Sequence, residues 1–377
     1  MAGQTRIAVL KERAAGESRV SATPETVKKF IALGAAVAVE QGAGERASIG
    51  DAVYREAGAE VGPLDSVVKD ADIVFGVQGP DPALLAGAKP GVWLAAVLDP
   101  FGQRARIDSY ASAGIEALAM EFMPRITRAQ SMDVLSSQSN LAGYKAVIAA
   151  ADTYGRAFPM MMTAAGTITA ARVFVMGVGV AGLQAIATAR RLGAQVSATD
   201  VRSATKEQIQ SLGAKPIFVE EVAGIEGEGQ GGYATEMSEE YQKAQAALVS
   251  SHIAKQDIVI TTALIPGRAA PRLISDAQIA TMKPGSVIFD LAVGQGGNVE
   301  GSVADQVVEK HGVKIMGYSN TPAHLAADAS ALFSRNLYNF LSAFWDNEAG
   351  KPVLDEEIGN AVRLTQAGKV VNERLLG

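Results

Sequence analysis

The chain has 377 residues, of which 48% are hydrophobic and 20% charged, and its net charge is −6. This composition supplies large apolar cores, so it excludes a disordered chain, and at roughly 150 residues per domain it predicts two domains. The acidic balance argues against a nucleic-acid partner, because phosphate binding needs clustered lysine and arginine. Cysteine is absent, which excludes disulfides, thiolate catalysis and cysteine-ligated metal sites.

Histidine and the terminal segments add two more exclusions. The three histidines have no metal-ligand spacing, so we expect His252, His311 and His324 at the surface and predict no metal site. The N-terminus has no secretory pattern, and the uncharged stretch 173–189 is too short and too rich in glycine to span a bilayer. We therefore expect a cytoplasmic chain with no direct membrane insertion.

The N-terminal third of the chain alternates apolar runs of strand length with helical segments. A helix is expected over 24–33, with Pro24 at its start and Gly34 just after its end. Continuous apolar strands separated by helices indicate a parallel sheet that is covered on both faces. The expected strands are 6–10, 35–40, 72–77, 92–98 and 114–120.

A long helix, expected over 137–154, leads into a second α/β unit. The methionine-rich stretch 158–162 follows it, and we interpret these residues as packing material. A final long helix is expected over 323–344, and it would return the chain to the first domain. The strands expected in the second unit are 172–176, 195–199, 216–219, 257–262, 286–291 and 313–318.

The predicted fold is therefore α/β, with two doubly wound, Rossmann-like parallel sheets joined by long helices. Residues 1–136 together with 325–377 are expected to form the first domain. Residues 137–324 are expected to form the second, a dinucleotide-binding domain.

The second domain opens with a glycine motif that predicts its ligand. The strand 172–176 runs into G-x-G-x-x-G at Gly177, Gly179 and Gly182, and a helix is expected over 183–192. Such glycines permit a tight turn, let the backbone approach a pyrophosphate and allow close packing of helix on strand. The helix N-terminus adds partial positive charge for the phosphates. This pattern predicts dinucleotide binding.

An acidic residue at the end of the next strand indicates which dinucleotide is bound. Asp200 follows the strand 195–199, where a carboxylate can accept hydrogen bonds from both ribose hydroxyls. Its charge would repel a 2′-phosphate, which favours NAD over NADP. Arg202 could pair with such a phosphate, so the preference is not closed.

Two polar segments have more than one interpretation. Residues 122–144 are dense in arginine, glutamine, serine and asparagine, which either cap a helix or supply donors and acceptors to a ligand. Residues 220–240 are rich in glycine and glutamate, and they form either a surface insertion or a lid that carries Tyr233.

At these motifs the chain resembles the NAD(H)-binding component, domain I, of proton-translocating transhydrogenase, in the alanine dehydrogenase/transhydrogenase superfamily. The strongest likeness is the run PRITRAQSMDVLSSQSNLAGY at 124–144. The likeness covers nearly the whole chain, and it includes 11–13, 19–20, 158–167, 177–182, 199–202, 232–234 and 262–267.

The resemblance implies that the chain binds NAD(H) and passes hydride from NADH to NADP⁺ on an NADP(H)-binding partner subunit. A membrane proton-channel subunit would couple this step to proton translocation. The chain would be a homodimer and would lie peripherally on the cytoplasmic face of the inner membrane through its partners. The resemblance also favours the lid interpretation of Tyr233.

The resemblance also assigns site residues. Those expected to hold the nicotinamide and its ribose are Arg125, Gln130, Asp133 and Ser136. Those expected to hold the rest of the dinucleotide are Gly177, Val178, Gly179, Val180, Ala181, Gly182, Asp200, Val201, Arg202, Tyr233, Ala263 and Leu264.

An alternative is a self-contained dehydrogenase of the related alanine dehydrogenase type, which must transfer a proton as well as a hydride. The resemblance places its substrate arginine at Arg19, but it places its substrate lysine at Gln78, its histidine at Asp99 and a catalytic aspartate at Gly294. Three of the four ionisable groups are therefore missing. Arg19 is then expected to pair with a carboxylate inside the first domain. A regulatory NAD-binding module without turnover is a third possibility that the residues alone leave open.

Overall fold

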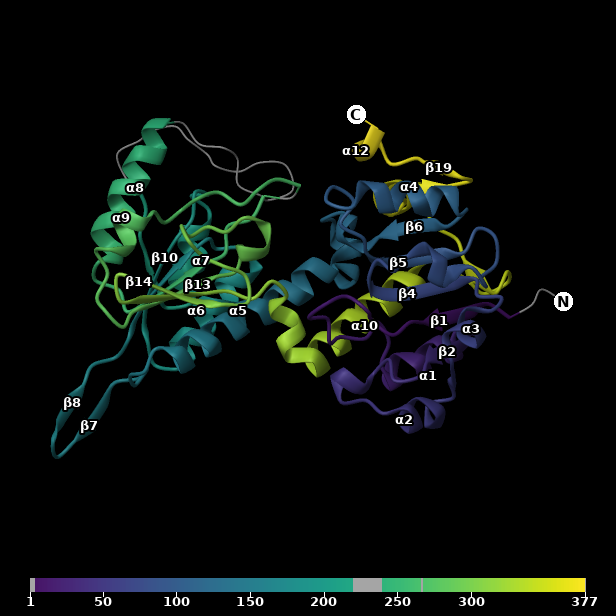
Figure 1. Ribbon diagram of the computed structural model, residues 1–377, viewed down its shortest axis with the longest axis horizontal. Coiled ribbons are helices and arrows are strands. Elements are labelled where there is room, and N and C mark those ends of the chain that lie inside the picture. The colour runs from purple at the N-terminus through teal and green to yellow at the C-terminus, as the bar shows by residue number, and fades with distance from the viewer. Residues whose placement is uncertain (1–3, 220–238, 266, 377) are drawn as a thin grey trace. The chain divides into compact units, whose positions relative to one another are not determined.

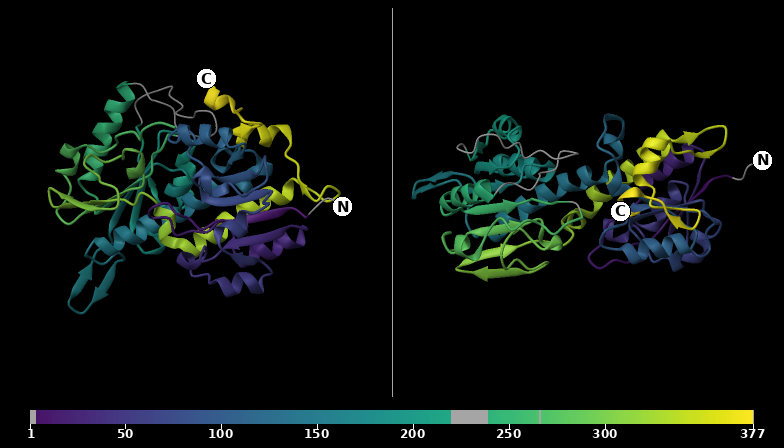
Figure 2. Two further views of the ribbon diagram at one scale, coloured as in Figure 1. Left: turned by 45° about the vertical axis from the view of Figure 1, so that its right-hand side comes forward. Right: turned by 90° about the horizontal axis from the view of Figure 1, so that it is seen from above.

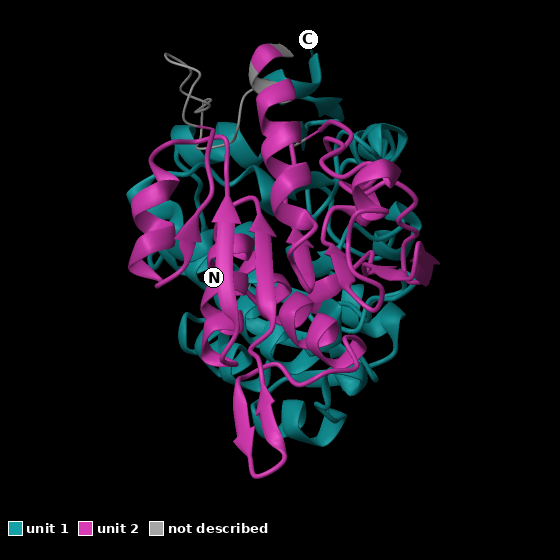
Figure 3. Cartoon of the chain, turned by 90° about the vertical axis from the view of Figure 1, so that its left-hand side faces the viewer, with its two compact units in different colours: residues 1–138, 323–377 teal, residues 139–322 magenta. Residues whose placement is uncertain are grey.

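The computed structural model describes residues 4–219, 239–265 and 267–376, in two compact units (Figures 1 and 3). Unit 1 consists of Met1–Gln138 and Ala323–Gly377, and unit 2 of Ser139–Pro322. Both are α/β, as the sequence predicts. Tyr233 and most of the glycine- and glutamate-rich segment lie outside the described residues.

Unit 1 is built on a six-stranded sheet whose strand order is β3-β2-β1-β4-β5-β6. Every pair in it is parallel, and the register places Ile7 beside both Val37 and Ile73. The order reverses between β1 and β4, which is the topological switch point of a doubly wound sheet. The strands are β1 (Arg6–Val9), β2 (Ala36–Glu40), β3 (Glu60–Gly62), β4 (Ile73–Gln78), β5 (Trp93–Val97) and β6 (Glu116–Ala119).

Helices cover both faces of this sheet. Ile7 and Val9 face a core that contains Phe30 and Phe333, whereas Ala8 and Leu10 face a second core that contains Tyr110. One face is covered by α1 (Pro24–Ala32) and α10 (Ala326–Ala343), and the other by α3 (Leu64–Val68) and α4 (Arg104–Ser112). Smaller elements complete the unit, namely α2 (Asp51–Glu56), α11 (Glu356–Val362), α12 (Glu373–Leu376) and the hairpins of β16 (Trp345–Asp346) with β17 (Lys351–Pro352) and β18 (Thr365–Gln366) with β19 (Lys369–Val370).

Unit 2 has a seven-stranded sheet in the order β11-β10-β9-β12-β13-β15-β14. All pairs are parallel except the edge pair of β14 with β15. The expected strand 216–219 is only the two-residue β11, and β14 was not expected. The strands are β9 (Arg172–Met176), β10 (Gln195–Thr199), β11 (Lys215–Pro216), β12 (Ile258–Thr261), β13 (Val287–Asp290), β14 (Val307–Lys310) and β15 (Val313–Met316).

The sheet of unit 2 is also covered on both faces (Figure 1). Val173 and Val175 pack in one core with Ile186 and Ile209, while Phe174 packs with Ile253 in another. The first core is shared with α5 (Val134–Thr153), α6 (Val180–Arg191) and α7 (Thr205–Ser211), and the second with α8 (Glu239–Ile253) and α9 (Asp276–Ile279).

The methionine-rich stretch is not packing material, and that prediction is wrong. It forms an antiparallel hairpin of β7 (Met161–Thr163) and β8 (Gly166–Ile168) that extends away from the rest of unit 2 (Figures 1 and 2). Met160 is 62% exposed and Met162 77% exposed. The strands pair with each other rather than with the seven-stranded sheet, so their apolar side chains are left without a core.

Candidate functional site

The glycine turn between β9 and α6 has the backbone geometry of a dinucleotide-binding turn. Gly177 has a φ of +98°, which a residue with a side chain rarely adopts, and a Cβ there would lie 2.5 Å from Thr262 Oγ1. A Cβ on Gly182 would lie 1.9 Å from the carbonyl oxygen of Gly177. Gly179 differs, because a Cβ there would meet no protein atom within 4 Å. Two glycines therefore permit the tight turn and the close packing, and the third leaves open space at the turn.

The N-terminus of α6 is open at the same place. The helix begins at Val180, three residues before the expected Leu183, because Gly179 is its N-cap and the first turn already includes Gly182. Gly179 provides no side-chain cap, the first turn contains no acidic residue, and Val180 and Ala181 are exposed. Backbone N–H groups at such a terminus, together with the helix dipole, favour an anion.

Asp200 lies at the end of β10, next to this turn. Its Oδ2 accepts the Val178 N–H at 2.7 Å and Arg202 Nη2 at 2.9 Å, and its Oδ1 accepts Arg202 Nε and the Arg202 backbone N–H, each at 2.9 Å. Burial raises the pKa of Asp200, but the hydrogen bonds from Arg202 and the backbone outweigh it and hold this pKa below its usual value. Val201, between the two, is half-buried. The carboxylate is therefore ionised and fixed beside the glycine turn.

The segment after β12 approaches the turn from the neighbouring strand. Thr262 Oγ1 donates to the carbonyl oxygen of Gly177 at 3.0 Å. Asn298 then holds Ala263, accepting its N–H at 3.1 Å and donating to its carbonyl at 2.9 Å. Leu264 is 38% exposed. Sequence reasoning missed Asn298, which lies far along the chain and belongs to no motif.

The expected nicotinamide residues all lie in unit 1. Arg125 and Gln130 are exposed, the latter in a 3-10 helix, η4 (Thr127–Met132). Asp133 accepts the Ser136 backbone N–H at 3.0 Å and its hydroxyl at 2.5 Å, just before α5 begins. The structure brings Asp133 and Ser136 together as a helix cap, which is one of the two interpretations left open by the sequence.

Side chains of α10 hold this loop in place. Asn336 and Asn339 both donate to the carbonyl oxygen of Ser131, at 2.8 and 3.0 Å. Asn336 also accepts the Ser137 hydroxyl at 2.7 Å. The loop that carries Gln130 is therefore fixed at its base, while its exposed side chains are left for a ligand or partner.

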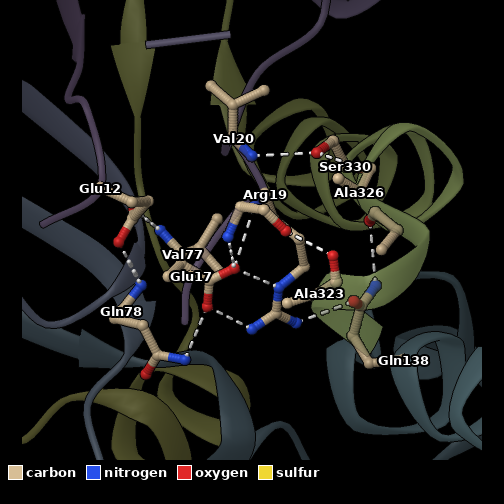
Figure 4. Close-up of polar contacts among 12 residues, drawn as sticks. Glu12, Glu17, Arg19, Val20, Val77, Gln78, Gln138, Ala323, Ala326 and Ser330 are labelled. Carbon is tan, nitrogen blue, oxygen red and sulfur yellow. Dashed lines mark hydrogen bonds and ion pairs between the residues drawn. The ribbon is translucent and has the colours of Figure 1, made fainter. Parts of the chain in front are cut away.

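Arg19 is engaged by its own domain, as predicted. Its Nε and Nη2 donate to the two carboxylate oxygens of Glu17 at 2.8 and 2.7 Å, and its Nη1 donates to Gln138 Oε1 at 2.9 Å (Figure 4). Gln78 Nε2 donates to Glu17 Oε2 at 3.1 Å. Both members of the ion pair are buried, so the guanidinium that would bind a substrate carboxylate is already matched to an internal one.

Two buried carboxyl groups in unit 1 were not found from the sequence. Glu12 follows β1 and accepts the backbone N–H groups of Val77 and Gln78 at 2.5 and 3.3 Å. Glu121 follows β6 and accepts those of Leu98 and Asp99 at 2.8 and 2.6 Å. Burial raises the pKa of each carboxyl to about 7. Both cap the carboxyl end of a neighbouring strand, and no motif marks them.

The described residues offer neither a metal site nor a membrane span. Among them, no cluster of three or more histidine, cysteine or acidic side chains could hold a metal. His311 and His324 are exposed, as expected, whereas His252 is half-buried, contacts Ser197 Oγ at 2.8 Å and packs against Phe174. Within the same described ranges, no helix is long and apolar enough to cross a bilayer.

Both halves of the chain match known proteins. The N-terminal domain model of alanine dehydrogenase/PNT matches residues 8–142, and the C-terminal domain model matches residues 146–373. The first of the separately encoded portions of NAD(P) transhydrogenase subunit alpha from Rhodospirillum rubrum is 52% identical over 380 residues, covering 99% of each chain. Alanine dehydrogenase of Mycobacterium tuberculosis is 31% identical over 302 residues, covering 79% of this chain and 75% of that protein.

A solved structure agrees with these matches. The transhydrogenase of Sinorhizobium meliloti superposes with a TM-score of 0.88 at 52% identity, covering 97% of this chain and 100% of the other. Similarity at this level extends through both units and includes the glycine turn and the polar loop. The chain therefore belongs to the alanine dehydrogenase/PNT family and is similar over its whole length to the transhydrogenase alpha subunit.

Proposed function

We propose that the chain is the NAD(H)-binding subunit of a proton-translocating transhydrogenase and passes hydride from NADH to NADP⁺ held on a partner subunit. The observation that carries this proposal is the 52% identity, over essentially the whole of both chains, to a protein named as a transhydrogenase subunit. The open glycine turn and the ionised Asp200 support the nucleotide assignment.

The residues fit NAD(H) on physical grounds. The open space at Gly179 and the uncapped start of α6 suit a pyrophosphate, and Asp200 suits a ribose with two free hydroxyls. Thr262 and Asn298 hold the turn and the segment at Ala263 in one conformation, which preorganises the site. When bound, the nicotinamide supplies the hydride chemistry, and the protein has to bind and orient it.

The polar loop is proposed to hold the nicotinamide half. Arg125 and Gln130 offer exposed donors, and the Asp133–Ser136 pair is rigid because it also caps α5. Transfer of hydride between two nicotinamides releases no substrate proton, so positioning suffices and a general acid or base is not needed. This agrees with the engagement of Arg19 by Glu17, which leaves no matched set for an amino-acid substrate.

The assembly is proposed to be a homodimer that works with an NADP(H)-binding subunit and a membrane subunit that translocates protons. The β7–β8 hairpin supports an association surface, because a two-stranded hairpin with exposed methionines is marginal in water by itself. Through these partners the chain would lie peripherally on the cytoplasmic face of the membrane.

Mixing the purified chain with an NADP-binding subunit tests the proposal. NADP⁺ should be reduced at the expense of NADH only when both proteins are present. NADH binding without any transfer in the presence of a competent partner would instead identify a non-catalytic NAD-binding module.

A further inference from the structure

Asp200 has no hydrogen-bonding capacity left for a ribose. An ionised carboxylate offers about four lone-pair positions, and here four N–H groups occupy them, one from Val178 and three from Arg202. The two backbone donors are fixed by the chain, since they belong to the glycine turn and to the residue two positions after Asp200. The Nε and Nη2 of Arg202 are the donors that side-chain rotation can remove.

We propose that Arg202 is a latch on the nucleotide site, whose guanidinium must leave Asp200 before ribose hydroxyls can bind there. This inference rests on the proposed function, because it takes Asp200 as the ribose ligand. Only 18% of the Arg202 side chain and 6% of the Asp200 side chain are exposed, so water screens their pairing weakly. The bidentate fork is also the geometry in which arginine binds a carboxylate best.

The latch lowers the affinity for NADH. When a ligand binds only one of two conformations, its apparent dissociation constant rises as the fraction of protein in that conformation falls. Removing the guanidinium should therefore tighten NADH binding by about tenfold, which corresponds to about 1.4 kcal/mol and lies at the low end for hydrogen bonds to a charged group.

The same latch has the opposite effect on a nucleotide that carries a 2′-phosphate. In the latched state the guanidinium neutralises Asp200, so the repulsion of a phosphate is reduced. Without Arg202 the carboxylate charge is bare, and NADPH binding should weaken. Arg202 would therefore narrow the preference between the two nucleotides, and its loss would widen that preference from both sides.

Titration of NADH and NADPH against wild type, Arg202→Ala and Arg202→Lys tests this inference. Arg202→Ala should bind NADH about tenfold tighter and NADPH more weakly. Arg202→Lys keeps the charge but lacks the fork, so it should gain NADH affinity while holding NADPH as wild type does. Arg191→Ala is the matched control, because Arg191 is an exposed cation in the last turn of α6 and its loss changes the net charge equally.

The outcomes separate this inference from the proposed function. If wild type fails to bind NADH, the proposed function fails. If wild type binds NADH but Arg202→Ala binds it equally or more weakly, the latch is wrong while the function stands. Equal shifts in Arg191→Ala would also overturn the latch, since they would reflect net charge alone.

Discussion

Glu121 offers a quantitative test of the electrostatics of unit 1. Its Oε1 caps the backbone N–H groups of Leu98 and Asp99, and among the described residues its buried Oε2 has no hydrogen-bond partner. Burial raises the pKa of this carboxyl from 4.5 to about 7, with a smaller contribution from the charge of Asp99. The Glu121→Gln variant would keep an oxygen for the two N–H groups and remove the titration.

The sign and size of the effect follow from proton linkage. Between pH 4.5 and about 7 the folded protein keeps a proton on Glu121 that the unfolded chain has released. The stability from this group is therefore fully present below pH 4.5 and is lost as the pH rises through about 7. A shift of this size corresponds to about 3 kcal/mol, at about 1.4 kcal/mol for each pKa unit.

Thermal unfolding of wild type and Glu121→Gln between pH 5 and pH 8 measures this loss. The melting temperature of wild type should fall relative to that of the variant by about 5–10 °C over this range. The comparison of slopes removes any constant cost of the unpartnered amide in the variant. Glu56→Gln, at an exposed position at the end of α2, is the control and should run parallel to wild type. Parallel curves for Glu121→Gln and wild type would refute the buried, protonated state.

Three further predictions concern the nucleotide site. Gly182→Ala places a Cβ 1.9 Å from the Gly177 carbonyl oxygen, so it should cost about 1–3 kcal/mol in chemical denaturation and weaken NADH binding, whereas Gly50→Ala, which meets open space, should do neither. Asp200→Ala should weaken NADH binding in fluorescence titration, and an unchanged dissociation constant would remove Asp200 from the ribose. Gln130→Asn, at an exposed position, should leave NADH affinity nearly unchanged but slow single-turnover hydride transfer by about tenfold or more, and a wild-type rate would contradict its role.

Most of the architecture was predictable because buried parallel strands have a strong sequence signal. The runs at β1, β4, β9, β12 and β13 are continuously apolar, and the structure confirms a strand at each. The glycine turn was equally clear, since its steric demands exclude other residues at Gly177 and Gly182. Short edge elements such as β3 and β14 were missed, because half-exposed strands lack that apolar signal.

The contacts that tune the sites could not be predicted in the same way. Glu12, Glu121 and Asn298 act through backbone groups that are remote in sequence, and no local spacing brings them to notice. The hairpin of β7 and β8 was misjudged because apolar composition does not distinguish a buried residue from an exposed one. By contrast, the pairing of Arg19 was inferred correctly, since a buried guanidinium requires an acceptor.

Direct hydride transfer is the central claim, and isotope labelling tests it most directly. NADH that carries deuterium at both transferable C4 positions would be mixed in ordinary water with the chain, its NADP-binding partner and NADP⁺. The NADPH product, analysed by mass spectrometry, should contain one deuterium per molecule, because hydride passes between nicotinamides without exchange. NADPH without deuterium, or no NADPH from a competent mixture, would contradict the account.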